Sequence, residues 1–473
     1  MKRCSAILLL PVLLVLACHS ETTWDHSMNG IWKSIGSGML LEIKDSTSYS
    51  FYDITSISCL PNHQGSLKDL EASLHKDTLT LKEGVLRYKF TRSQELPERC
   101  NSHDKALNRK DPLYNFDVFS ETVKEHYAYL ELNKINWDML YKEQREKLSK
   151  ASTDAELYLL IEATLDLLND NHAFLEAPDK VYEEVEKLET KPEESSQGEP
   201  AELGDLAVAK TVASHHLQEE MTEDSWLIQW GKLTDEIGYI QVKTMWLYAD
   251  ITIPKALIED MGFVDAFIET RHKMYEGKYI KKEVQGVRKT MDRVMNDLAS
   301  MKSIVIDIRF NGGGQDAVSF EILRRFSAQK QQVARQKFRV GEAFTREVPI
   351  DIDGTKNAFT KPVYVLTSPQ TGSAAEAFSL GSLALSNIKR IGASTQGALS
   401  TTLDKTLPNG WVFSISNEIY MDNEGTCYEN VGVPVDYKLD YATDRQTFFR
   451  TIVNDLGADK QSILQAIKVL EVQ

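Results

Sequence analysis

Three short segments, far apart in the chain, carry the residue types that acyl transfer needs: a serine, a base and free backbone amides. Ser373 follows an apolar segment and precedes the helix-forming run 374–377. A serine at a helix N-terminus lies in the partial positive charge of the aligned peptides, which favours its alkoxide. A serine that only caps the helix is also common at this position. The segment alone therefore does not distinguish a nucleophile from a cap.

A triple-glycine turn follows the most apolar strand pattern of the sequence. Residues 303–308 read SIVIDI, and Asn311 then precedes Gly312, Gly313 and Gly314. Glycines adopt backbone conformations closed to other residues and let a ligand approach the main chain. The amides of such a turn, placed before a helix, can bind an anion. A phosphate loop is the rival interpretation, but the turn lacks both the Lys-Ser/Thr ending of a P-loop and the GxGxxG spacing.

His172 supplies a candidate base. It ends a turn of small polar residues, 169–172, that follows an apolar helix pattern over 155–168. An imidazole in such a turn is close to neutral at pH 7 and available to accept a proton. A surface histidine without a role is the alternative that the residues leave open.

The elements that must position these residues alternate between strand and helix from residue 226 onward. Strand patterns at 237–244, 303–308 and 362–366 are separated by helical patterns, and three more apolar segments, at 388–392, 411–416 and 417–421, are expected to complete the sheet. This alternation predicts an α/β fold with a mostly parallel sheet covered on both faces. A long helical stretch over 254–301 exceeds what a crossover between strands needs.

The N-terminal half has a different pattern. Short alternating segments predict a small β-barrel or sandwich module over 28–95, and helical spacing predicts a helical subdomain over 110–180. Residues 181–223 are rich in Glu, Lys, Ser and Pro, and we expect a charged linker or surface excursion. The α/β core then spans 224–473.

Charge and the N-terminus limit the possible partners. The 473 residues include 54 Lys and Arg against 70 Asp and Glu, a net charge of −16, which argues against a nucleic-acid partner. Lys2 and Arg3 precede an apolar run over 6–17, so residues 1–17 are expected to be a signal peptide. The string 15–18 resembles a bacterial lipobox. We expect lipidation of Cys18, a tether over 18–27 and a location in the bacterial cell envelope; an ordinary cleaved signal is the alternative.

The remaining cysteines allow one plausible disulfide. Cys59 and Cys100 flank the small N-terminal region, and an exported chain permits them to pair. Cys427 is left over. The sequence has neither a CxxC pair nor an HExxH motif, so we expect no metal and no cofactor.

Taken in order, these segments resemble the tail-specific (C-terminal-processing) serine protease family. That family has a strand ending D-x-R-x-N-x-G-G, a nucleophile in S-A-x-E, a T-x-G turn and a closing G-V-x-P-D. The matching residues are Asp307, Arg309, Asn311, Gly313, Gly314, Ser373, Ala374, Glu376, Thr395, Gly397, Gly432, Val433 and Asp436. Asp436 stands one place later than the usual Pro-Asp. The resemblance implies a ClpP/crotonase-like core and a serine peptidase acting on peptides or proteins.

The resemblance also implies which base is used. In the processing branch a lysine follows the T-x-G glycine, but here that position is Ala398 and the nearest lysine is Lys405. The other branch resembles the tricorn core protease and the interphotoreceptor retinoid-binding protein modules, and it takes a histidine from an L-x-D-x-H turn. Leu168, Asp170 and His172 match that turn. This branch also orients the histidine with a glutamate before the G-V motif.

The implied site is therefore Ser373 as nucleophile, His172 as base and Glu429 steadying the imidazolium, directly or through a neighbour such as Asn171. The oxyanion would lie at the amides of Gly313 or Gly314 and of Ala374. Two other readings remain open. The same fold in the retinoid-binding relatives carries hydrophobic ligands without catalysis, and the β module could make the protein chiefly an adaptor. The forty or so residues before the core are too few for a PDZ domain, so gating is expected from the helices within 254–301.

Overall fold

The computed structural model describes residues 26–45, 47–101, 109–188 and 201–472. The signal peptide, Cys18 and most of the tether lie outside these residues. Over the described ranges, no helix combines the length and the apolar character that crossing a membrane requires.

The N-terminal β module is a seven-stranded antiparallel sheet with the order β4-β3-β2-β1-β7-β6-β5. Five of its strands were expected from their alternation, whereas β4 and β5 were not, because their polar residues hide the pattern. Trp32, Leu41, Leu79 and Phe90 form the centre of its core. Cys59 and Cys100 form the expected disulfide. The strands are β1 (Gly30–Ser34), β2 (Met39–Ile43), β3 (Ser48–Ile54), β4 (Cys59–Ser66), β5 (Ala72–His75), β6 (Thr78–Glu83) and β7 (Leu86–Ser93).

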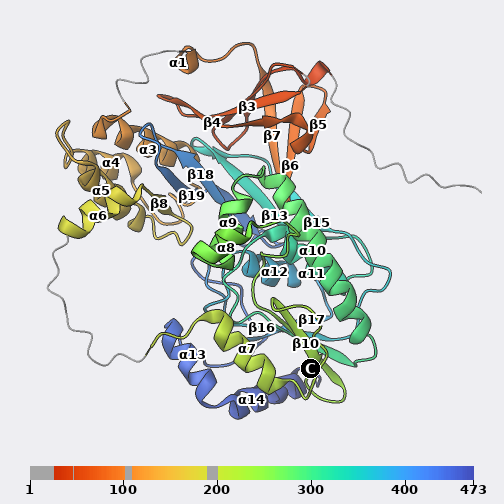
Figure 1. Cartoon of the computed structure of the whole chain (residues 1–473). Helices are drawn as coiled ribbons and strands as arrows, with labels where there is room; N and C mark the ends of the chain where they lie inside the picture. The colour runs from red at the N-terminus through yellow and green to blue at the C-terminus, as the bar shows by residue number, and fades with distance from the viewer. Residues whose placement is uncertain (1–25, 46, 102–108, 189–200, 473) are drawn as a thin grey trace, which may run out of the picture.

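The helical subdomain packs beside this module and carries the turn of His172 (Figure 1). Its helices begin at capping residues: Asp111 accepts from the amide of Leu113, and Thr153 with Glu156 forms a capping box. The elements are α3 (Pro112–His126), α4 (Trp137–Arg145), α5 (Asp154–Asp166), β8 (Phe174–Glu176) and α6 (Asp179–Leu188), whereas α1 (Glu98–Asn101) lies beside β4 of the β module.

The core contains a second seven-stranded sheet, of order β21-β17-β16-β12-β11-β10-β9. The strands from β11 to β21 in this order are parallel, and β10 and β9 are antiparallel to their neighbours. This confirms the expected mostly parallel α/β core. The strands are β9 (Glu219–Glu220), β10 (Ile228–Lys232), β11 (Ile237–Val242), β12 (Ser303–Asp307), β16 (Val363–Thr367), β17 (Ile388–Gly392) and β21 (Tyr437–Lys438).

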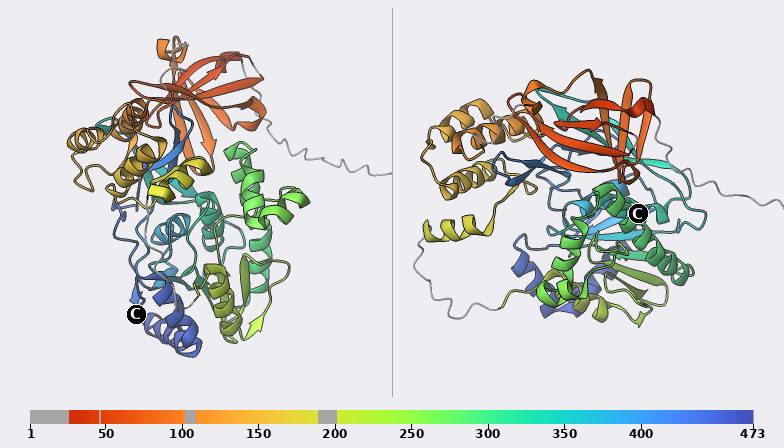
Figure 2. Two further views of the ribbon diagram at one scale, coloured as in Figure 1. Left: turned by 60° about the vertical axis from the view of Figure 1, so that its left-hand side comes forward. Right: turned by 45° about the horizontal axis from the view of Figure 1, so that its top comes forward.

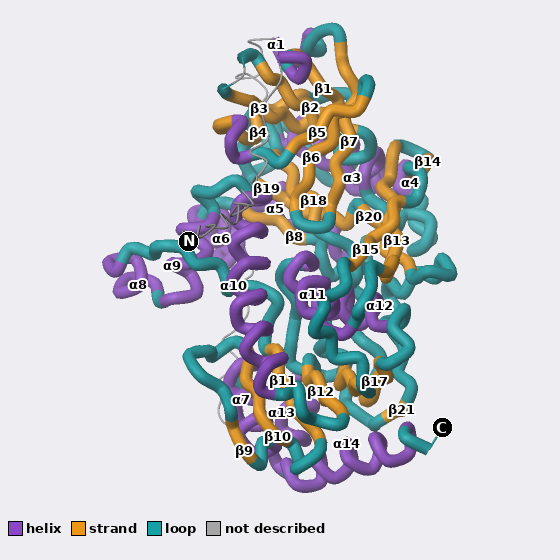
Figure 3. The backbone as a smooth tube through the Cα atoms, turned by 90° about the vertical axis from the view of Figure 1, so that its right-hand side faces the viewer, coloured by secondary structure: helices purple, strands orange, loops and turns teal. Residues whose placement is uncertain are grey.

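Helices cover both faces of this sheet (Figure 3). Helices α10, α11 and α12 bury apolar residues against one face, and α7, α13 and α14 bury theirs against the other. The helices of the core are α7 (Asp205–His216), α8 (Lys255–Met261), α9 (Phe263–Arg271), α10 (Glu276–Asp297), α11 (Asp316–Leu323), α12 (Ala374–Ser382), α13 (Arg445–Asn454) and α14 (Leu456–Leu470).

Two further sheets lie between the core and the β module (Figures 1 and 2). One has the order β18-β19-β8, and the other the order β14-β13-β15, with β20 paired to β13. The expectation that residues 411–421 complete the main sheet is therefore wrong, because these strands pair antiparallel with β18 and β13 instead. The strands are β13 (Gln331–Val340), β14 (Ala343–Phe344), β15 (Val348–Ile352), β18 (Thr402–Thr406), β19 (Val412–Ser416) and β20 (Glu418–Met421).

The region 181–223, expected as a charged linker, contains most of α6 and all of α7. Helix α7 packs on the core because Val208, Ala209, Val212 and Ala213 place apolar side chains at helical spacing, and all four are buried. Their short apolar stripe is hidden in the sequence by the charged residues before it. Residues 189–200, which contain the segment KPEESSQGEP, lie outside the described residues.

Candidate active site

Ser373 lies between β16 and the start of α12, in a backbone conformation that non-glycine residues rarely adopt. Its φ is 49° and its ψ is −123°. Such a residue costs free energy and persists only where its surroundings fix it. The turn before it is fixed by hydrogen bonds to the segment after β12: the amide of Gly372 donates to the carbonyl of Asn311 at 3.1 Å, and the hydroxyl of Thr371 donates to the carbonyl of Ile308 at 3.0 Å.

Glu376 holds the serine turn from inside. Its fully buried carboxylate accepts from the amide of Ser373 at 3.2 Å, the hydroxyl of Thr395 at 2.6 Å, and the amides of Gly397 and Ala398 at 2.6 and 2.7 Å. Burial raises the pKa of Glu376 to about 7, although these hydrogen bonds oppose the shift. The matched residues Thr395 and Gly397 therefore donate hydrogen bonds to this carboxylate. Glu376 had no predicted role of its own, although its place in the S-A-x-E motif was a signal for one.

His172 reaches Ser373 across 201 positions of the sequence. Its Nε2 lies 3.0 Å from Ser373 Oγ. The histidine turn follows α5, and Asp170 shapes it: Asp170 Oδ1 accepts from the His172 amide at 2.9 Å and from the Ser416 hydroxyl at 3.0 Å. Burial lowers the pKa of His172, and the charge of Asp170 only partly offsets this. The imidazole is therefore neutral at pH 7 and can accept the serine proton.

Glu429 is buried near this pair but does not contact the imidazole. Its Oε2 accepts from the amide of Leu399 at 2.8 Å. Burial, together with the nearby carboxylates of Asp170 and Glu376, raises the pKa of Glu429 to about 8. Nδ1 of His172 has no hydrogen-bond partner among the described residues. The expected direct contact from Glu429 is therefore absent, as is the expected relay through Asn171, and Asp170 is the carboxylate whose charge acts on the ring.

The three backbone amides expected at the oxyanion site differ in availability. The amide of Gly313 donates to Asn311 Oδ1 at 2.9 Å, so it is already engaged. Within the described ranges, the amides of Gly314 and Ala374 donate to no other group. Gly313 itself packs directly on the serine, because a Cβ at its position would lie 2.6 Å from Ser373 Cβ, and its φ is +117°. Its role is close approach, and Gly314 and Ala374 remain as free donors.

The matched residues Asp307 and Arg309 belong to a buried ion-pair network and are not among the residues that line the cavity of Ser373 and His172. Arg309 pairs with Asp307 and with Asp459, each at 2.8 Å, and all three side chains are buried. Asp436 pairs with Arg390 at 2.5 Å, so the shifted final aspartate ties β17 to the closing segment. Lys405 points away from the serine to Asp53 of the β module, at 2.8 Å. Lys405 is thus engaged by the β module.

Ser373 and His172 open into a cavity of about 580 Å³. Its walls come from the site itself, from β18, from the connection between α9 and α10, and from the β module. In the described residues, no group of three or more His, Cys, Asp or Glu side chains could hold a metal ion. The arrangement places a hydroxyl, a neutral imidazole and two free amides around one cavity, which suits acyl transfer.

Two family models match the chain. Residues 236–439 match peptidase family S41, and residues 108–166 match the tricorn protease C1 domain. Ser373, Gly314 and Glu429 lie in the first match, and His172 lies six residues beyond the second. No curated protein matches the sequence.

Solved structures of low sequence identity share the fold. A candidate peptidase from Parabacteroides merdae is 17% identical, with 74% of this chain and 98% of that chain covered and a TM-score of 0.52. Mature CPAF in complex with lactacystin is 11% identical, with 76% and 99% covered and a TM-score of 0.51. The expected protease fold is thus confirmed.

Proposed function

We propose that this serine-type peptidase, whose residues 236–439 match peptidase family S41, is an endopeptidase of the bacterial cell envelope acting through Ser373 and His172. The observation that carries the proposal is the 3.0 Å approach of His172 Nε2 to Ser373 Oγ beside a cavity. That distance lies within hydrogen-bonding reach, so the base can take the proton as the hydroxyl attacks.

In the proposed reaction, His172 Nε2 takes the proton of Ser373 as Oγ attacks a peptide carbonyl. The oxyanion of the tetrahedral intermediate binds the amides of Gly314 and Ala374. The imidazolium then gives its proton to the leaving amine, and water hydrolyses the acyl-enzyme with His172 again as base. The leaving amine thus departs protonated, and the serine is restored when the ester is cleaved.

Two carboxylates support the base in this proposal. Asp170 lowers the free energy of the imidazolium by its charge, because it is the group that raises the pKa of His172. Glu429, the glutamate expected from the sequence, has its pKa raised to about 8 and acts as a positioning residue that accepts a hydrogen bond from the amide of Leu399. We therefore propose a Ser-His site supported by Asp170, with Glu429 behind it.

Fluorophosphonate labelling with mass mapping tests the nucleophile. We expect the label on Ser373, and we expect Ser373→Ala and His172→Ala each to abolish it and to lower kcat on peptides by about 10⁴-fold or more. Ser149→Ala and His215→Ala, which change exposed side chains far along the sequence from the site, serve as matched controls. Labelling of another serine, or full turnover by Ser373→Ala, would overturn the proposal.

The endopeptidase character needs its own assay. Peptides blocked at both ends should be cleaved as readily as free ones, since we propose recognition of internal segments. A strict requirement for a free C-terminal carboxylate would show a processing peptidase instead.

The envelope location rests on the N-terminal sequence. We propose that Cys18 carries the lipid after removal of residues 1–17. In a bacterial host, metabolic labelling with a fatty-acid analogue should mark the wild type and the Cys4→Ala control, whereas Cys18→Ala should lose the label and leave the membrane fraction. An unlabelled wild-type protein in the soluble envelope fraction would indicate an ordinary cleaved signal.

A further inference from the structure

The β module lies outside both family matches, yet it lines the catalytic cavity. The matches begin at residue 108, whereas the cavity that contains Ser373 and His172 is also lined by Met39, His63, Leu86 and Tyr88. A module attached only by a tether would not form a wall of the site. Its contacts with the rest of the chain therefore decide whether this wall is a fixed part of the enzyme.

Buried polar contacts fix the module to the core. Lys405 Nζ pairs with Asp53 Oδ1 at 2.8 Å and donates to the Gly38 carbonyl at 3.1 Å, with both charged side chains buried. Asn417 Nδ2 donates to the Gly36 carbonyl at 3.0 Å. Separating the module would leave these groups without partners unless water replaced them, which opposes free movement. The wall is thus built into the fold.

The turn between β6 and β7 forms a second attachment. Gly84 packs so closely on α10 and α11 that a Cβ there would lie 3.1 Å from Ile280 and 3.2 Å from Ala317, at a φ of +57°. Next to it, the Tyr275 hydroxyl donates to the Glu83 carboxylate. The turn is therefore held against the helices that flank the serine loop.

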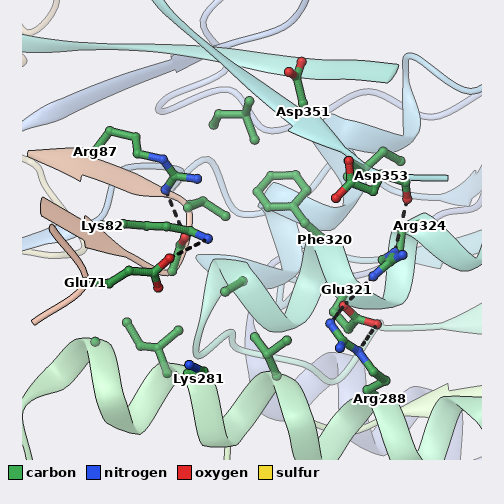
Figure 4. Close-up of a pocket in the computed structure, with 18 of the residues that line it drawn as sticks. Glu71, Lys82, Arg87, Lys281, Arg288, Phe320, Glu321, Arg324, Asp351 and Asp353 are labelled. Atoms are coloured by element: carbon green, nitrogen blue, oxygen red, sulfur yellow. Dashed lines mark hydrogen bonds and ion pairs between the residues drawn. The ribbon is translucent and has the colours of Figure 1, made fainter. Parts of the chain in front are cut away.

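This turn separates the catalytic cavity from a second one, of about 670 Å³. Gly84, Val85, Ile280 and Ala317 line both. Figure 4 shows the charged side chains of the second cavity, of which Lys82 pairs with Glu71 at 3.4 Å and Arg288 with Glu321 at 2.9 Å. These groups largely satisfy one another. The second cavity extends the space beyond the turn but offers little unpaired charge.

Strand β7 presents different residues to the two cavities, as strand alternation requires. Leu86 and Tyr88 line the catalytic cavity, and Arg87 lines the second. Leu86 is half-buried, and Met39, Val85 and Met274 give the same space further half-buried apolar surface. A partly exposed apolar wall favours an apolar ligand group, because binding removes both surfaces from water.

We propose that the β module is the substrate-recognition wall of the peptidase, with Leu86 selecting large apolar side chains near the scissile bond. This rests on the proposed function and specifies its substrate class. The substrate is an extended peptide whose apolar side chain lies against Leu86 while its carbonyl faces Ser373. The module is thus part of the active site and not an independent adaptor.

Size changes at Leu86 test this inference with a positional peptide library. Leu86→Trp fills the space, so kcat/KM for peptides with a large apolar residue at one position should fall about tenfold or more, with preference moving to small residues. Leu86→Ala should move the substrate preference toward larger residues. Lys89→Ala and Lys89→Trp, at an exposed position on the opposite face of β7, are the matched controls and should keep the wild-type preference.

The rate of fluorophosphonate labelling separates the two hypotheses. All four variants should still be labelled at Ser373, because none of them changes Ser373 or His172, and the Lys89 variants should be labelled at the wild-type rate. If both Leu86 variants were labelled at Ser373 and kept the wild-type preference, the recognition role of Leu86 would be wrong and the proposed peptidase function would be unaffected. A wild-type protein that resists labelling would instead overturn the proposed function. If Leu86→Trp unfolds at a much lower temperature than the wild type, the substrate preference of Leu86→Ala alone tests the inference.

Discussion

The serine side and the histidine side of the site are built to different degrees of rigidity. Ser373 sits in a strained turn that is held by the carboxylate of Glu376. This carboxylate accepts four hydrogen bonds, from the Ser373 amide and from three donors in the turn 395–398. His172 sits in a partly buried turn of the helical subdomain, and its Nδ1 has no hydrogen-bond partner among the described residues. The nucleophile is thus held by redundant contacts and the base by few. The chemistry needs a fixed attack geometry, whereas a base can adjust its ring when substrate closes the site.

Removal of the Glu376 carboxylate should have the largest effect in this comparison. Glu376→Ala leaves four buried donors without an acceptor, so we expect the free energy of unfolding to fall by about 3 kcal/mol or more. We also expect kcat to fall by about 10³-fold as the serine turn relaxes. Denaturant unfolding and steady-state kinetics measure the two effects.

Glu376→Gln is the matched control for that change, since it keeps the shape and one acceptor oxygen. It should lie between the wild type and Glu376→Ala in both measurements. If Glu376→Ala kept full stability and turnover, the serine side would not depend on this carboxylate.

On the histidine side, Asp170→Asn should have the next largest effect. The variant keeps the size of the residue but loses the charge that raises the pKa of His172. We expect kcat to fall by about 10²-fold, and the acid limb of the pH profile to move to still lower pH. Asp166 is an exposed carboxylate at the end of α5, the helix before this turn, and Asp166→Asn should behave as the wild type. An acid limb that stays in place would show that Asp170 does not act on the ring.

Glu429→Gln should have a smaller effect, below tenfold at pH 7. The pKa of Glu429 is raised to about 8, so the carboxyl is mostly neutral at pH 7 and an amide resembles it. The difference from the wild type should grow above pH 8, where only the wild type gains a charge. Parallel pH profiles of both proteins measure this. A loss as large as that of Asp170→Asn at pH 7 would restore Glu429 as the direct partner of the base.

The smallest effect is expected in the wild type itself, as a shift of the pH at which activity is lost on the acid side. Burial lowers the pKa of His172 below its ordinary value of about 6.5, and the reaction needs the neutral ring. Activity should therefore be lost only as the pH falls through this lowered pKa. A profile of kcat/KM from pH 4 to 9 measures the limb, and a midpoint above 6.5 would mean that the charged imidazole is stabilised in the free enzyme.

Several features of the site could be read from the sequence because they are local. The apolar strand before Asn311 and the helix pattern after Ser373 depend on residues within a few positions of one another. The ordered motifs then gave the family and the fold class. The disulfide of Cys59 and Cys100 was anticipated on another ground, because few cysteines remain in the chain after the signal segment.

Other features could not be read because they depend on contacts between distant segments. The hydrogen bond of the Gly313 amide depends on the side-chain direction of Asn311. That the charge of Asp170, and not that of Glu429, acts on the ring of His172 depends on distances that no motif records. Strand β20 joined another sheet because it pairs with β13, which lies far earlier in the chain, and β19 forms a hairpin with its neighbour β18.

The sequence by itself determined the chemical groups of this protein, since residue type and local spacing fix which atoms a turn can present. Only the tertiary structure decided which groups meet: His172 with Ser373 across 201 positions, and a β module without a family match as a wall of their cavity. The physical reason is that periodicity is a property of neighbouring residues, whereas the pairing of distant surfaces follows from the burial of the whole chain.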